Sequence, residues 1–548
     1  MAKQSAWGWR LTLFQFFSRE SSRGFEPIQP TPPATYILSR WLFLRLLGLV
    51  YLLAFVSLWM QVHGLVGSRG ILPATDLLKA AQEQLGGRCY WQFPSLFWLS
   101  SSDAALNLVC AAGTLLSLLL IIGLAPIPVL MLLWFTYLSL SVIGQVFLSF
   151  QWDALLLETG FFAIFFAPAT LLPRMSRERP PSTLARWALW WLLFKLMFLS
   201  GITKLLSGDP TWRDLTAMNF HYQTQPIPNW VSWYIYQLPE WCQKTMVVLT
   251  FVMELIVPCF IFATRRLRHA AGAAMILLQV VIELTGNFGF FNLLTAVLCI
   301  PLLDDTLLRQ WAPRRWTAWL DVDRPGVTTP MWRRRLFTAT VSMLLLVSGL
   351  TFVREMVRTG NPQKLANGVQ MALDAANVCL LSWGEPYVLR WTTPLRTING
   401  YGLFRVMTTE RPEIVIEASS DGNTWSEVPF RWKPGSLKRP PPIVAPYMPR
   451  LDWQMWFAAL NPQRNQSWLA PLMQRLLEGS PEVIDLVGEN PLPDGPPRFV
   501  RLAYYRYEFT EWKTRRATGE WWQRTHLGYL TRRISLPPTS DVPEPGAG

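Results

Sequence analysis

The sequence predicts a multi-pass α-helical membrane protein of about nine spans, with an extramembrane β-rich α+β domain at its C-terminal end. Of its 548 residues, 51% are hydrophobic and only 16% are charged, whereas soluble domains have roughly 25% charged residues. The apolar residues gather in long runs before residue 354, and strand-like alternation follows later in the chain. The content of 29 tryptophans and 31 phenylalanines excludes an intrinsically disordered chain.

Nine apolar runs are long enough, or nearly so, to cross a bilayer, which takes about 20 residues. They cover residues 41–62, 104–123, 126–149, 154–173, 187–206, 246–264, 269–285, 288–304 and 336–353. A mostly polar stretch precedes the first run, so that run is interpreted as an anchor and not as a cleaved signal peptide. The predicted parts are a cytosolic segment 1–40, a transmembrane domain 41–353, an extracytosolic β-rich domain 354–536 and a disordered Pro- and Gly-rich tail 537–548.

Basic residues predict the orientation of the spans. Four arginine-rich segments fall on one side of a nine-span chain: Lys3, Arg10, Arg19, Arg23 and Arg40; Arg174, Arg177, Arg179 and Arg186; Arg265, Arg266 and Arg268; and Arg309, Arg314, Arg315, Arg324, Arg333, Arg334 and Arg335. Short loops rich in Lys and Arg stay in the cytosol, so residues 354–548 are expected outside it. These segments account for most of the net charge of +14. No basic stripe remains for nucleic acid, and no nucleic-acid partner is predicted.

The region after residue 354 has its own pattern. A helix with apolar residues at helical spacing is predicted from Pro362 to about Leu381. Strands are predicted at 402–409, 413–419, 424–432 and 498–510, with Asp421-Gly422 as a hairpin turn between the second and the third. The Pro-rich stretch 433–450 predicts an extended surface arm, and residues 451–460 and 468–477 predict amphipathic helices.

Polar residues at membrane depth are the candidates for a site, because an unpaired charge is costly there. The simplest interpretation is that they pair with one another, as Lys195 and Glu254 could on consecutive spans. Four chain segments nevertheless bring polar residues to the same outer face, which we call the outer polar cluster: Trp152, Asp153, Glu158, Lys204, Asp209, Arg213, His221, Glu283, Asn287 and Asn292. The grouping predicts either a functional site or a docking surface for the C-terminal domain. We expect Glu158 to face the bundle interior and Lys204 to lie near Asp153, Glu158 or Asp209.

Sequence motifs give no indication of a catalytic or metal-binding site. The sequence has no nucleophile elbow, phosphate loop or zinc-binding helix motif. The four histidines, His63, His221, His269 and His526, are far apart in the sequence, so neither a metal site nor a cofactor is predicted. Cys89 and Cys242 are both expected on the outer side, where they could form a disulfide or remain free thiols.

Five segments carry a specific resemblance. They are SFQWDALLLETGF (149–161), SGDPTWRDLTAMNFHYQTQPIPNW (207–230), LTGNFGFFNLLTAVLCIPLLDD (284–305), YGLFRVMTTERPEIVIEASSDGNTW (401–425) and RPPPIVAPYMPRLDWQMWFAAL (439–460). Together they resemble the signature segments of the lipase maturation factor family, in the family's order. The resemblance implies a multi-pass protein whose C-terminal domain faces the lumen of the endoplasmic reticulum. It also implies a chaperone-like factor that assists folding and dimer assembly of secreted lipases such as lipoprotein lipase. A bacterial member would lie in the inner membrane, with that domain in the periplasm.

Two functions follow from the sequence and its resemblances. The first is a non-catalytic maturation factor that holds a secreted client through exposed aromatics, with Trp425, Trp432, Trp453 and Trp456 as candidates; the same tryptophans could equally be core residues. The alternative is an intramembrane enzyme, because the membrane region is also similar to vitamin K-dependent carboxylase. There, FLSGITKLLSGD (198–209) resembles the stretch with the carboxylase's base lysine, which would make Lys204 the general base.

The predicted orientation can be tested with a Gly435→Cys variant in sealed vesicles or spheroplasts. Because residue 435 is expected outside the cytosol, a thiol reagent that does not cross membranes should label it from the non-cytosolic side. Labelling only after the cytosolic side has been opened would contradict the nine-span orientation.

Overall fold

The computed structural model describes residues 35–173, 178–311, 313, 330–361, 363, 365–488 and 495–537. Apart from Pro537, the predicted disordered tail lies outside the described residues, and so does the N-terminal segment up to residue 34. The same is true of Arg174, Arg177, Arg314, Arg315, Arg324 and Pro362 among the residues named above. From Tyr36 onward the chain forms one compact unit.

Seven helices among the described residues are long and apolar enough to cross a membrane. They are α2 (Ile37–Trp59), α6 (Asp103–Ile122), α7 (Pro126–Ile143), α9 (Thr183–Leu206), α13 with its continuation η4 and η5 (Glu240–Phe262), α14 (Arg265–Thr285) and α18 (Met331–Thr359). Two shorter helices, α8 (Gln151–Phe166) and α15 with η6 (Phe291–Leu302), occupy the fourth and eighth predicted spans. A helix therefore stands at each of the nine predicted spans, and the predicted fold class is confirmed.

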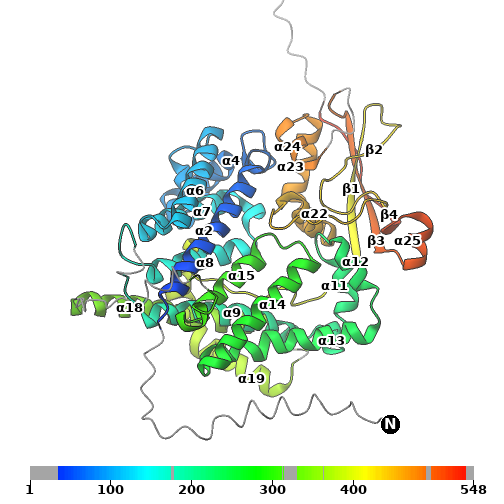
Figure 1. The fold of residues 1–548 in the computed structure, drawn as a ribbon. Coiled ribbons are helices and arrows are strands. Elements are labelled where there is room, and N and C mark those ends of the chain that lie inside the picture. Colours follow the sequence, from blue (N-terminus) through cyan, green and yellow to red (C-terminus); the bar gives the residue numbers. More distant parts are fainter. Residues whose placement is uncertain are drawn as a thin grey trace, which may run out of the picture. The chain divides into compact units, whose positions relative to one another are not determined.

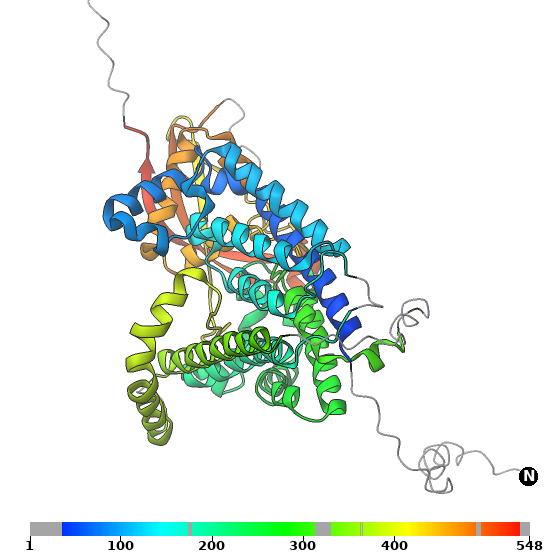
Figure 2. The ribbon, with the colours of Figure 1, turned by 90° about the vertical axis from the view of Figure 1, so that its left-hand side faces the viewer.

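Glycines allow close approach where the membrane helices cross. Gly113 on α6 faces the ring of Phe55 on α2, and Gly48 on α2 faces Ile121 on α6. Figure 2 shows α6 alongside α2. Small residues at such crossings let two backbones come close enough for van der Waals contact, which drives association where the hydrophobic effect between helices is weak.

Short helices connect the spans. Between α2 and α6 lie α3 (Val62–Val66), α4 (Ala74–Leu85), η1 (Gly86–Arg88), α5 (Cys89–Gln92) and η2 (Leu96–Trp98). The segments α10 (Pro210–Arg213), α11 (Met218–Thr224) and α12 (Trp230–Tyr236) follow α9, and α16 (Asp305–Leu308) follows η6. Cys89 on α5 and Cys242 on α13 are both free. Of the two alternatives left open for this pair, the structure has the free thiols, with Cys89 buried on α5 and Cys242 partly buried at the start of α13.

The C-terminal part begins with a helical segment and ends in a sheet. The segment comprises α19 (Asn367–Ala376), η8 (Asn377–Leu381), α20 (Ser382–Gly384), η9 (Glu385–Leu389), α21 (Arg390–Thr392) and η10 (Thr393–Leu395). Four strands, β1 (Arg411–Ser419), β2 (Ser426–Glu427), β3 (Phe499–Phe509) and β4 (Trp522–Ile534), form an antiparallel sheet in the order β2-β1-β3-β4. The remaining helices are α22 (Arg450–Leu460), η11 (Gln463–Asn465), α23 (Gln466–Leu477), α24 (Pro481–Val487) and α25 (Trp512–Thr518). Figure 1 shows α22, α23 and α24 beside this sheet.

Most of the predicted elements of this region are present. The hairpin is confirmed, with Glu417 opposite Glu427, although β2 has only two residues. The strand at 498–510 and the helices at 451–460 and 468–477 are confirmed as β3, α22 and α23. The helix predicted to end at Leu381 continues through further helical turns to Leu395. The strand β4 was not predicted, because its exposed, arginine-containing sequence lacks clear apolar alternation.

Two predictions for this region are wrong. Residues 402–409 are irregular and do not form a strand, and Phe404 adopts a left-handed backbone conformation with a φ of 51°. Their apolar side chains Leu403 and Phe404 instead line a cavity among the membrane helices. The Pro-rich stretch 433–450 is not a surface arm, since Val444 and Met448 are buried in the main hydrophobic core.

Replacing Gly113 with alanine should destabilise the protein. The added methyl group would overlap the Phe55 ring, so α2 and α6 must separate, at a cost of about 1–3 kcal/mol. The matched control is Gly349→Ala on α18, where nothing lies within 4 Å of the new methyl group and helix propensity favours alanine by up to about 1 kcal/mol. Thermal unfolding in detergent should show a lower midpoint for Gly113→Ala only; equal midpoints would contradict this packing.

Candidate functional site

The outer polar cluster is joined to the C-terminal part by a buried ion pair. Arg450, the first residue of α22, donates from Nη1 to Asp153 Oδ2 at 2.9 Å and from Nη2 to Asp153 Oδ1 at 2.8 Å. Asp153 lies in the first turn of α8 and also accepts a hydrogen bond of 2.5 Å from Tyr137. Both charged side chains are 1% exposed. This two-pronged geometry is the strongest form of an arginine–carboxylate contact.

The chain just before α22 is held by the end of α2. Met448 N donates to Ser57 Oγ at 3.0 Å, and Gln61 Nε2 donates to the carbonyl of Met448 at 2.9 Å. Arg450 N donates to Gln61 Oε1 at 2.9 Å. Ser57 of α2 and Gln61, two residues after its end, thus bind backbone groups that lie about 390 positions later in the chain.

Glu158 faces the interior of the helix bundle, as predicted, and is fully buried. Lys195 on α9 donates to its Oε1 at 2.5 Å and to Ser348 on α18 at 3.0 Å. The other carboxylate oxygen accepts from Tyr401 OH at 2.7 Å and from Asn399 N at 2.9 Å. The site therefore links three membrane helices with the chain that leads into the sheet.

The expected ion pairs of the two lysines are wrong. Lys195 pairs with Glu158 and not with Glu254, while Lys204 pairs with Glu254 and not with Asp153, Glu158 or Asp209. The lysines are nine positions apart on α9, which is about two and a half turns. They consequently project from opposite sides of α9, one toward α8 and the other toward η4.

Lys204 lines a cavity of about 80 Å³ inside the bundle, together with Glu254, Gln279 and Asn292. Its ammonium group donates to both oxygens of Glu254, at 3.0 and 2.7 Å, and to the carbonyl of Ser200 at 3.0 Å. Three donated hydrogen bonds use all three protons of an ammonium group. The ammonium group is thus engaged in a structural ion pair with Glu254, and the geometry does not support Lys204 as a general base.

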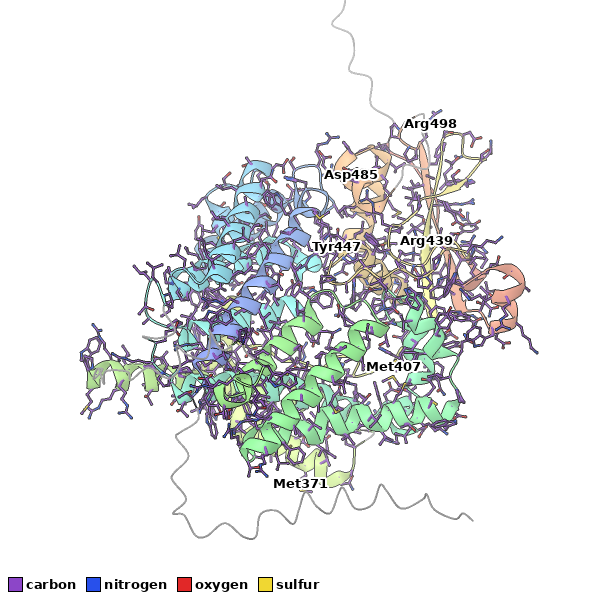
Figure 3. All side chains as sticks on the ribbon, viewed as in Figure 1. Met371, Met407, Arg439, Tyr447, Asp485 and Arg498 are labelled. Carbon is purple, nitrogen blue, oxygen red and sulfur yellow. The ribbon has the colours of Figure 1, made fainter. Side chains whose placement is uncertain are left out.

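Three further members of the outer polar cluster contact the C-terminal part. Asp209 accepts from the backbone N of Met407 at 2.6 Å; Met407 is labelled in Figure 3, beside the helices after α9. His221 packs edge-to-face against Phe404, with ring centroids 5.0 Å apart. Asn287 donates to Pro442 O at 2.8 Å and accepts from Val444 N at 2.7 Å.

The other polar members have different surroundings. Asn292 donates to Glu283 at 2.7 Å, within the membrane part. Arg213 is exposed at the end of α10 and is engaged in contacts of its own. The cluster is thus brought together as predicted only in part: Asp153, Glu158, Asp209, His221 and Asn287 bind residues of the C-terminal part, which favours the interpretation as a docking surface.

The tryptophans named as client-binding candidates differ in exposure. Trp453 and Trp456 on α22 are buried, 4% and 8% exposed, so the expectation of exposed aromatics is wrong for them. Trp453 packs on Trp152 of the outer polar cluster, with ring centroids 4.7 Å apart, because α22 lies on the start of α8. Trp425 and Trp432 are partly exposed.

A second anchor was missed from the sequence. Arg411, the first residue of β1, is buried and donates to the carbonyls of Gln223, Gln225 and Pro226 at the end of α11 and just after it. Like Arg450, it is a single arginine at the start of an element, and neither had a distinctive pattern around it. The available signal was that both lie within the five segments that carry the family resemblance.

Comparisons with known proteins agree with this two-part construction. Residues 38–310 match the family model of the lipase maturation factor transmembrane domain, and residues 397–531 match that of the lipase maturation factor C-terminal domain. Lipase maturation factor 2 of Homo sapiens is 38% identical, over 91% of this chain and 83% of the relative. The chain belongs to the lipase maturation factor family.

Other relatives match over a similar extent. Lipase maturation factor 1 of Bos taurus is 34% identical over 90% of this chain and 88% of its own length. Lipase maturation factor 2 of Xenopus laevis is 36% identical over 89% and 81%. No solved structure is significantly similar to the chain. The pair Asp153–Arg450 joins the two regions that the family models match separately.

Breaking the pair Asp153–Arg450 should loosen the junction between the two family regions. Arg450→Met leaves a buried carboxylate without its cation, which costs about 3–5 kcal/mol, whereas a double variant with Asp153→Leu should recover part of that loss. The control is Arg464→Met, at an exposed position after α22. Thermal unfolding in detergent of the wild type, the two single variants Arg450→Met and Asp153→Leu and the double variant gives the coupling energy; additive effects of the two substitutions would contradict the pair.

His221 should make the protein less stable in mild acid. Burial, with a contribution from the charge of Lys204, lowers the pKa of His221 to about 4, from 6.5. The folded state therefore binds fewer protons than the unfolded chain, and stability falls as pH drops from 6.5 toward 4. His221→Gln should lose less stability than the wild type between pH 7.5 and pH 5, by about 1–2 kcal/mol. His526→Gln, at an exposed position on β4, is the control, and an identical acid response of both variants would contradict the assignment.

Proposed function

We propose that this protein is a membrane-anchored, chaperone-like maturation factor that holds a secreted client protein at its C-terminal sheet. Membership in the lipase maturation factor family supports the maturation role. The names of the relatives, lipase maturation factors 1 and 2, point to a secreted lipase as the client. The enzyme alternative finds no support, since Lys204 is engaged with Glu254.

The observation that carries the proposal is the open edge of the sheet. β4 pairs with β3 on one side, and no strand among the described residues pairs with its other side. Leu527, Tyr529 and Leu530 on this strand are 49%, 50% and 37% exposed. An unpaired edge offers backbone donors and acceptors to an extended segment of an incompletely folded client. Arg532 and Arg533 on the same strand disfavour pairing between two copies of this edge.

Trp425, just before β2, extends this surface across the face of the sheet. The guanidinium group of Arg501 on β3 lies 4.1 Å from the Trp425 ring and 4.5 Å from the Tyr529 ring. The two rings and the arginine between them form a partly exposed aromatic surface on the sheet that reaches Tyr529 of β4, of the composition found at the centres of protein interfaces. Trp432 packs against Tyr447 and is a weaker candidate.

The proposed location follows from the distribution of charge. Arg265, Arg266 and Arg268 lie at the start of α14. The C-terminal part binds Asn287, just after the other end of this helix. By the positive-inside rule, the sheet would lie in the lumen of the endoplasmic reticulum in a eukaryote and in the periplasm in a bacterium. The partners are then the lipid bilayer and a secreted client.

The test is production of active lipoprotein lipase in cells that lack their own lipase maturation factors and express this protein. The variant Leu527→Glu/Leu530→Glu should lower secreted lipase activity by about tenfold, which corresponds to a loss of about 1.4 kcal/mol of client binding. Both positions are exposed, so the amount of membrane-inserted protein should not change. Leu460→Glu, an exposed leucine at the end of α22, is the matched control.

A photo-crosslinking residue at Tyr529 provides a second readout. It should capture the newly made lipase, whereas the same residue at position 460 should not. Full lipase activity in the double variant, or capture at 460 alone, would contradict client binding at β4.

A further inference from the structure

The helical segment Asn367–Leu395 lies against the last membrane helix with one face only. Leu373 packs beside Gly360 at the end of α18. Further along, Leu389 shares an apolar cluster with Val347 and Leu350 of α18. Trp391 near its end also contacts Trp91 of α5, while many of its other side chains are exposed.

The second half of this segment exposes a stripe of large apolar side chains. Exposed fractions are 69% for Val378, 37% for Leu380, 44% for Trp383, 76% for Tyr387 and 58% for Trp391. Figure 3 shows Met371, on the preceding α19, at the edge of the molecule. Single exposed apolar residues are ordinary on a soluble surface, but a contiguous stripe of this size marks contact with another apolar phase.

The contacts of the segment place this stripe near one surface of the membrane. Asn361 N donates to the carbonyl of Leu206, the last residue of α9, at 3.1 Å, so the chain leaves α18 at the ends of two spans. Val347, which belongs to the same apolar cluster as Leu389, lies six residues before the end of the predicted span 336–353, or about 9 Å deeper. That depth matches an amphipathic helix in the membrane interface, which inserts about 5–10 Å. Trp383, Tyr387 and Trp391 are residue types enriched at this level.

A hollow of about 790 Å³ lies at the end of the stripe. Three arginines line it: Arg88 from the loop before α5, and Arg390 and Arg396 from the segment and the turn after it. Trp91 and Trp391 stand at its side, with ring centroids 6.2 Å apart. No carboxylate is among its lining residues.

Two of the three arginines of this hollow have no counter-ion among the described residues, whereas Arg396 lies within the electrostatic influence of Asp153. Neither Arg88 nor Arg390 has an ion-pair or hydrogen-bond partner in the part of the chain that the structure describes, and both are exposed. Arg396 donates to the carbonyl of Leu148, a neutral acceptor, at 3.3 Å. Guanidinium groups with free donors, beside aromatic rings at interfacial depth, fit the phosphate of a lipid whose chains contact the neighbouring apolar stripe.

We propose that residues 377–395 lie in the membrane interface on the side of the C-terminal sheet, and that the hollow lined by Arg88, Arg390 and Arg396 binds the phosphate of an anionic phospholipid. The segment is then a second contact with the bilayer, between the two regions that the family models match. This contact with the bilayer lies next to the start of the sheet-bearing part. The proposal does not depend on which client that part binds.

Depth can be measured with an environment-sensitive fluorophore on Tyr387→Cys, in full-length protein whose native cysteines are replaced by alanine. In lipid nanodiscs, a nitroxide on the lipid near the headgroup should quench the emission by about half. The control is Lys513→Cys on α25, which is exposed and should not be quenched. An unquenched, water-like emission at position 387 would overturn the interfacial placement.

Headgroup binding can be measured by native mass spectrometry of protein with its native cysteines, purified in equimolar phosphatidylcholine and phosphatidylglycerol. The wild type should retain phosphatidylglycerol in preference, and Arg88→Gln/Arg390→Gln should reduce this retention by about tenfold. The matched control, Arg464→Gln/Arg516→Gln, removes the same charge from exposed positions elsewhere and should retain the lipid. Equal retention by both double variants, or no preference in the wild type, would overturn the lipid site. Complete displacement of the lipid by millimolar inorganic phosphate would show a site for a free anion instead, and would also overturn it.

Discussion

The buried pair between Asp153 and Arg450 is the constraint on which the rest of the outer face depends. Moving a carboxylate or a guanidinium out of water costs several kcal/mol per ion, and only a well-formed pair with further hydrogen bonds offsets that cost. Asp153 stands at the start of α8 and Arg450 at the start of α22, 297 positions apart. Neither can remain buried unless the other is in place. The C-terminal part therefore completes the membrane bundle and is more than a domain attached to it.

The same reasoning extends to the neighbouring contacts. Glu158 is satisfied by a lysine from the membrane part and by Tyr401 and Asn399 from the chain leading into the sheet. Arg411 is satisfied by backbone carbonyls after α11. Each buried charge thus uses partners from both parts, which makes their separation costly. A polar cluster at membrane depth is often functional, but here Asp153, Glu158, Asp209, His221 and Asn287 are engaged in the junction itself.

Hydropathy was sufficient to predict the helices, because a span must satisfy its backbone internally and its length is set by the bilayer. It was not sufficient to predict which charges pair. The partners of Lys195 and Lys204 depend on the rotation of α9 about its axis, and a depth estimate along the chain contains no information on rotation. Arg450 was missed because its partner is set by a tertiary contact. Trp453 and Trp456 were misjudged because α22, although amphipathic in sequence, is covered on both faces, by the start of α8 and by the sheet-bearing part.

A firm junction has a consequence for client binding. Contacts at Ser57, Gln61, Asp153 and Asn287 fix the chain on both sides of α22, and β1 is fixed through Arg411. The sheet that carries β4 is consequently held against the membrane helices by buried contacts and not by a flexible tether. A binding edge that is already ordered loses less conformational entropy when a client strand adds to it. Rigidity at the junction and an open edge at β4 are therefore complementary requirements: the first keeps the surface in one arrangement, and the second leaves its backbone groups free to pair.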